Sequence, residues 1–515
     1  MTRLPAEIIA NIISCLAGEG NRYDGSHRFV VINKDSDCLA LAPYAAVSRG
    51  WQQSIEAVTF AHIALTPARL ASPLAAQALT PDRVCSFVRT IRFDVVLPPY
   101  DEQARARRED EADRAINNGV FTNATRRLFA LLADSQGGGQ QQQQPKICLS
   151  ITTNCISDTE DMETRLYQWR VLGRLDADIY EARYESSYLD LRLAAGTQSI
   201  QDEAEALPQL HCINQFRVFA TGGPGRLHPA WRPFAPRAVC LIASRMPGLE
   251  RIQWHLSDNE KRDVALRKSL RADFANALQT LPSSLQHFEL EYSRDIPLDH
   301  SFQTPSLDET DRHNDKLSLA LFKLSQRLAS FSLMADVGPE ALWPGECIQD
   351  DDPFWPRMRS YFINPGAITP SGQWRFLRSD SNDSNDSDDE QDMLSNDTDP
   401  FAAPGDEMEE HFRNNPDPKA VHALLLATAR AVRRMPVLRD MRFELEQIGE
   451  GQVEVEYSAK KAKLIVDSHP MFHPDEEVVR LFREAAEEHA GAKSELEVVV
   501  SDSRADYNER CARGC

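Results

Sequence analysis

The sequence predicts an α/β protein with an N-terminal helical module, an irregular domain of helix–strand units and a C-terminal α+β cap. Three observations predict this class. Apolar residues recur at helical spacing near the start, a helix–turn–strand unit recurs through the middle, and short alternating segments fill the last part. We therefore divide the chain into residues 1–65, 66–378, 379–406 and 407–515.

Composition and charge limit the class of protein. Of 515 residues, 42% are hydrophobic, which is compatible with a packed core. The formal net charge of -21 argues against nucleic acid and anionic membranes as partners, but it permits a basic partner. We expect no membrane-spanning segment, no secretory signal and, from the ten scattered cysteines, no disulfide framework. We therefore expect a cytoplasmic or nuclear protein.

Two short apolar helices are predicted in the N-terminal module. Pro5 suits the first turn of the first helix, and Val47 to Phe60 forms the second. The residues expected on one face of each are Ile8, Ile9, Ile12, Ile13 and Leu16 in the first, and Val47, Trp51, Ile55 and Val58 in the second. Two helices this small cannot bury both faces alone, which indicates a partner.

Three motifs follow one another here: Leu-Pro-x-Glu-Ile-Ile, Val-Ser-Arg-x-Trp-Gln and Thr59-Phe60. In this order they resemble the F-box of filamentous fungi. Residues 18–38 are an insertion relative to the family pattern. The resemblance implies docking on a Skp-type adaptor of a cullin-based ubiquitin ligase. The implied adaptor-binding residues are Leu4, Pro5, Ile8, Ile9, Ile12, Val47 and Trp51. The alternative is an ordinary helical cap on the larger domain.

The first elements after this module are read from local patterns. Residues 87–96 and 146–151 are predicted strands, and Phe121–Leu132 is a predicted amphipathic helix. Asp101 to Arg114 carries mixed charges and is interpreted as a solvated helix face. Residues 137–144 form a glycine- and glutamine-rich linker.

A unit of helix, proline-containing turn, leucine and short strand then recurs. Its copies are 236–256, 271–290, 317–333 and 420–445, with a weaker copy at 355–363. Such units bury their apolar faces only by stacking, which would place the strands in a parallel sheet. The pattern resembles an irregular leucine-rich-repeat solenoid, although the regular asparagine ladder is not evident. The alternative is a non-repetitive α/β domain.

The remaining segments have contrasting composition. Residues 379–406 contain no basic residue and many acidic ones, so we expect a disordered acidic loop. The segments 453–457, 463–466 and 496–500 are predicted strands, and 474–489 is a predicted helix. Their order predicts the α+β cap.

Strand alternation predicts where a target could bind. Ile252, Phe288 and Phe331 should share one core on neighbouring strands. The intervening residues Arg251, Gln253, His287, Glu289, Ser330 and Ser332 should line the solvent side and bind the target. Trp254, Tyr292 and Tyr361 are either core residues or exposed binding anchors.

We find no nucleophile elbow, phosphate-binding loop or zinc pattern, so we expect no enzyme, no catalytic residue, no metal and no cofactor. The leading hypothesis is the substrate-recognition subunit of a Skp-cullin-F-box (SCF) ubiquitin ligase that holds an unknown target protein. The alternatives are an F-box-containing scaffold without a ubiquitination target, and an enzyme whose active site is assembled from scattered residues.

Overall fold

The α/β class is confirmed by the computed structural model of the chain, in which strands and helices alternate along most of the sequence. The structure describes residues 9, 12, 41–73, 79–105, 107–135, 146–159, 183–192, 205–219, 232–308, 315–345, 353–378, 403–406, 410–448, 451–491 and 495–502. The candidate residues Leu4, Pro5 and Ile8 lie outside these ranges.

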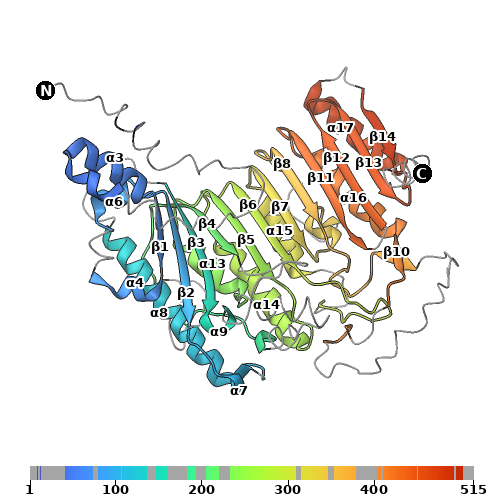
Figure 1. Cartoon of the computed structure of the whole chain (residues 1–515). Coiled ribbons are helices and arrows are strands. Elements are labelled where there is room, and N and C mark those ends of the chain that lie inside the picture. Colours follow the sequence, from blue (N-terminus) through green and yellow to red (C-terminus); the bar gives the residue numbers. More distant parts are fainter. Residues whose placement is uncertain are drawn as a thin grey trace, which may run out of the picture.

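One 12-stranded sheet organises the molecule, and its strands follow one another in sequence order (Figure 1). Its strands are β1 (His62–Leu65), β2 (Thr90–Leu97), β3 (Ile147–Cys155), β4 (Ile213–Phe219), β5 (Arg251–Ser257), β6 (His287–Ser293), β7 (Ser330–Ala335), β8 (Ser360–Asn364), β11 (Asp440–Ile448), β12 (Gly451–Ser458), β13 (Lys463–His469) and β14 (Glu497–Ser501). All neighbours are parallel except β11–β12 and β12–β13, which are antiparallel. A separate pair is formed by β9 (Phe376–Arg378) and β10 (Arg413–Pro416).

Helices stand between parallel strands in the sequence, and α13, α15, α16 and α17 lie along one face of the sheet (Figure 1). The α-helices are α3 (Arg49–Thr59), α4 (Pro67–Ala71), α6 (Pro81–Ser86), α7 (Glu102–Arg105), α8 (Glu111–Ser135), α9 (Ile156–Thr159), α13 (Pro236–Ser244), α14 (Val264–Ala277), α15 (Lys316–Ser325), α16 (Pro418–Val432) and α17 (Glu476–Ala490). The 3-10 helices are η1 (Ala42–Ala46), η2 (Leu278–Thr280) and η3 (Pro339–Ala341).

The period of two along each strand explains how the sheet buries one face. In β5, Ile252, Trp254 and Leu256 are at most 2% exposed, whereas the residues between them are exposed or half-buried. Ile252 pairs in register with Phe288 of β6, which pairs with Phe331 of β7. All three belong to the main hydrophobic core. The predicted strand register is therefore confirmed.

Aspartate caps set the starts of three helices between the strands. Asp263, Asp315 and Asp417 each accept a backbone N–H from the first turn of α14, α15 and α16. A carboxylate satisfies amide donors that have no partner inside the helix and favours the positive end of its dipole. Because Asp263 caps α14, this helix begins at Val264 and not at the predicted Arg271.

The N-terminal helices have a small core of their own. Ile9, Leu41 and Ile55 are buried together, with Ala45 and Trp51 packed against them. Ser48 caps α3, and its hydroxyl accepts the backbone N–H of Trp51 at 3.4 Å. Val47 therefore precedes the helix, and the prediction that it continues the helical face of Trp51 is wrong.

Two predicted boundaries also change. Strand β1 falls within residues 1–65, yet it pairs with β2 and belongs to the large sheet, so the helical part ends before His62. Residues 403–406, assigned to the acidic loop, pack on the domain. Asp406 forms a 2.6 Å ion pair with Lys261, and Ala403 is buried.

Candidate binding face

One face of the large sheet carries polar rows that run across its strands. The register aligns Gln215, Arg251, His287, Ser330, Ser360 and Asp440, one from each of six adjacent strands. A second row aligns Arg217, Gln253, Glu289, Ser332, Phe362 and Arg442. These twelve side chains are exposed or half-buried, so we call this side the open face.

The six predicted target-binding residues are brought together on the open face. Arg251, His287 and Ser330 are neighbours in the first row, and Gln253, Glu289 and Ser332 are neighbours in the second. They come from three successive strands, because the parallel register aligns equivalent positions of each helix–strand unit. Their location was predictable from strand alternation alone, whereas their binding role stays a prediction.

Side-chain contacts order the middle of the open face. The Gln253 amide donates to Oε1 of Glu289 at 3.0 Å, and Nδ1 of His255 lies 3.2 Å from Oε2 of Glu291. Burial lowers the pKa of His287, and the neighbouring Arg251 lowers it further. Both effects favour the neutral imidazole of His287 over its charged form, beside the exposed guanidinium of Arg251.

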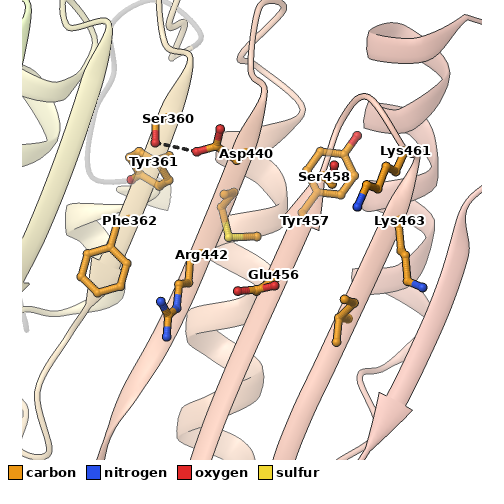
Figure 2. Close-up of a pocket in the computed structure, with 12 residues that line it drawn as sticks. Ser360, Tyr361, Phe362, Asp440, Arg442, Glu456, Tyr457, Ser458, Lys461 and Lys463 are labelled. Atoms are coloured by element: carbon orange, nitrogen blue, oxygen red, sulfur yellow. Dashed lines mark hydrogen bonds between the residues drawn. The ribbon is translucent and has the colours of Figure 1, made fainter. Parts of the chain in front are cut away.

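A pocket of about 380 Å³ opens on the same face between β8, β11, β12 and β13 (Figure 2). Phe362 lies on one side, Lys461 and Lys463 lie on the other, and Arg442 and Glu456 lie between them. The Ser360 hydroxyl donates to Oδ2 of Asp440 at 2.6 Å beside these groups. The pocket was not predictable from the separate segments, because β8 belongs to the weak predicted repeat and β12–β13 to the predicted cap, and they meet only in the sheet.

The aromatic candidates belong to the core and not to the open face. Trp254, Tyr292 and Tyr361 are each at most 1% exposed. Trp254 packs edge-on against Phe216 and Phe288, with ring centroids 6.0 and 5.7 Å away. Of the two alternatives, the core interpretation is correct. The half-buried aromatic rings of the open face include Phe362 of β8 and Phe219 of β4, which pairs in register with His255.

A buried ionic cluster lies where β5 and β7 end. Asp258 receives hydrogen bonds from Arg267 and Arg271, and Arg271 also reaches Asp315 at 3.0 Å. Burial opposes ionisation of Asp258, but the two guanidinium groups hold its pKa below the usual range. The two guanidinium groups and the two carboxylates balance one another's charge. Their ion pairs join the end of β5 to α14 and α14 to the start of α15.

A second buried pair corrects the interpretation of residues 101–114 as a solvated face. Glu109 is 4% exposed and forms an ion pair with Arg232, which is 2% exposed. Ser187 donates its hydroxyl to Oε2 of Glu109 at 2.6 Å. The charge pattern of the run gave no sign of this burial, because both partners are distant in sequence.

The candidate adaptor-binding residues are divided between core and surface. Ile9 is buried, Ile12 and Trp51 are half-buried, and Val47 is 63% exposed. Tyr44 and Val58 are also exposed, at 45% and 38%. The described part of the helical module therefore presents exposed apolar side chains at both ends of α3, away from the open face.

The chain matches no protein-family model, no curated protein and no solved structure in the comparisons made. Within the described ranges, no helix has both the length and the apolar character needed to cross a membrane. In the same ranges, no three His, Cys, Asp or Glu side chains converge so as to hold a metal ion.

Proposed function

We propose that this chain is the substrate-recognition subunit of an SCF-type ubiquitin ligase. The N-terminal helical module, which resembles an F-box, docks on a Skp-type adaptor, and the irregular repeat-like α/β domain holds a target protein on its open face. The chain itself does no chemistry. It raises the effective concentration of target lysines near the conjugating enzyme.

The observation that carries the proposal is the separation of two surfaces of different chemistry. The helical module has its own small core and exposes Tyr44, Val47 and Val58. The open face presents aligned polar residues over many strands. Exposed apolar side chains suit a stable docking partner, whereas a broad polar face suits selective recognition of a protein segment.

Affinity purification of the full chain from cells treated with a proteasome inhibitor tests the proposal. We expect a Skp-type adaptor, a cullin and at least one short-lived protein that accumulates with the inhibitor. Reversing two charges of the open face, Arg251→Glu with Glu289→Arg, should lose the short-lived protein and keep the adaptor.

A matched control reverses two exposed charges on α17, Arg483→Glu with Glu488→Arg, and should lose neither partner. Capture of adaptor and cullin without an inhibitor-stabilised protein would favour the scaffold alternative. Capture of neither the adaptor nor the cullin would refute the proposal.

A further inference from the structure

The pocket on the open face has a definite order of side chains. Phe362, Arg442, Glu456 and Ile465 are successive register partners on β8, β11, β12 and β13. An aromatic ring and an aliphatic side chain thus stand on either side of a cation and a carboxylate (Figure 2). Phe362 and Ile465 are both half-buried, so apolar surface remains accessible inside the pocket.

The cations of the pocket are largely committed to other groups. Nε of Arg442 lies 2.8 Å from Oε1 of Glu454, and its Nη2 lies 3.5 Å from Glu444. The Lys463 ammonium lies 2.8 Å from Oε1 of Glu497. Because both cations already pair with carboxylates, neither would bind an incoming anion as strongly as an unpaired cation would.

Negative charge is in excess beside Arg442. Glu444 and Glu454 are direct cross-strand partners, and Glu456 is the partner of Arg442 itself. Burial raises the pKa of Glu454, Arg442 opposes this, and Glu444 and Glu456 raise it further. Like charges on facing strand positions destabilise a sheet, so three carboxylates around one guanidinium favour a second cation.

We propose that this pocket binds an arginine side chain of the target protein, an inference that rests on the proposed function. The guanidinium stacks on the Phe362 ring and reaches the carboxylates of Glu456 and Asp440, and the arginine stem leaves the pocket on the side of Ile465. The exposed Lys461 donates to a backbone carbonyl of the same segment. Arginine fits better than lysine because its planar fork pairs with carboxylates and stacks on rings.

The net charge of the chain, -21, agrees with a basic target segment. The competing occupant is an acidic segment drawn to Lys461 and Lys463. The two occupants require opposite charge at the anchoring residue, so one experiment separates them.

The test uses the full chain and fluorescent peptide mixtures that differ only in a fixed central residue: arginine, lysine, glutamine or glutamate. Capture of each mixture is measured by fluorescence anisotropy. We expect arginine above lysine, both above glutamine, and glutamate last. Glu456→Lys should reduce arginine capture at least about tenfold, since it removes a charged hydrogen-bond acceptor and adds a repelling charge. Phe362→Leu should reduce the preference for arginine over lysine, while both of these should still be captured more strongly than glutamine and glutamate.

Glu488→Lys is the matched control, because it makes the same change at an exposed carboxylate of α17, away from the open face and outside the pocket. It should keep the arginine preference. Equal capture of all four mixtures, including capture of none, overturns the proposal, as does preferred capture of glutamate. Adaptor binding is measured on the same protein, so loss of the adaptor with an intact arginine preference contradicts the proposed function alone.

Discussion

Arg271 of α14 and Asp258, which follows β5, form an ion pair of 2.7 Å with side chains only 3% and 1% exposed. Arg267 binds the same carboxylate, also at 2.7 Å. The two arginines of α14 therefore hold the helix to the end of its preceding strand. Removing the negative charge would leave the buried Arg267 without its main partner and the buried Arg271 with Asp315 in place of two carboxylate partners.

Asp258→Asn should therefore lower the free energy of unfolding by about 3–5 kcal/mol, as expected when one partner of a buried ion pair is lost. Urea unfolding followed by circular dichroism measures the change. Glu477→Gln is the control, because its pair with Arg430 is 3.4 Å long and both side chains are over 40% exposed. It should cost about 0–1 kcal/mol. Equal losses in the two variants would show that the buried cluster does not stabilise the fold.

Glu340 predicts a pH dependence of stability. Burial raises the pKa of its carboxyl group from 4.5 to about 7. The folded state then binds more protons than the unfolded state between these values, so the free energy of unfolding falls as pH rises from about 4.5 to about 7. Glu340→Gln should lack this contribution and retain the hydrogen bond donated by the Asp315 N–H. Parallel stability curves for both proteins across this range would contradict the prediction.

Trp254 allows two substitutions with different expected costs. It is fully buried against Phe216 and Phe288, and its indole N–H has no hydrogen-bond partner in the described part of the chain. Trp254→Ala should cost about 3–5 kcal/mol because it leaves a cavity. Trp254→Phe should cost less than about 1.5 kcal/mol, since it keeps a ring and removes an unsatisfied donor. Similar unfolding midpoints for the two variants would refute the core assignment.

The middle of the fold was predictable because strand alternation is a local property. Ile252, Phe288 and Phe331 repeat in equivalent positions of their units, so their shared core follows from the sequence. The buried charges were not predictable. Glu109 and Arg232 are 123 residues apart, and neither stands in an apolar pattern that would indicate burial. The pocket depends on the antiparallel pairing of β11, β12 and β13, which no single segment encodes.

The acidic segment provides a test of where the folded domain resumes. Deleting residues 379–399 should leave the melting temperature nearly unchanged, because this stretch has little apolar surface to bury. Extending the deletion through Asp406 should lower it, since Lys261 then loses its 2.6 Å partner. Thermal unfolding by differential scanning calorimetry compares the two deletions. A large decrease for the shorter deletion would show that residues 379–399 are structural.

The central claim is that the N-terminal module docks on a Skp-type adaptor. Isothermal titration calorimetry of the full chain with purified adaptor measures this most directly. Wild type should bind with a defined stoichiometry, and the triple variant Leu4→Ala, Pro5→Ala and Ile8→Ala should show no detectable binding, since buried interface anchors typically cost about 2 kcal/mol or more each. Circular dichroism should show that the variant remains folded. Wild-type affinity in the triple variant, or no binding by the wild-type chain, would contradict the account.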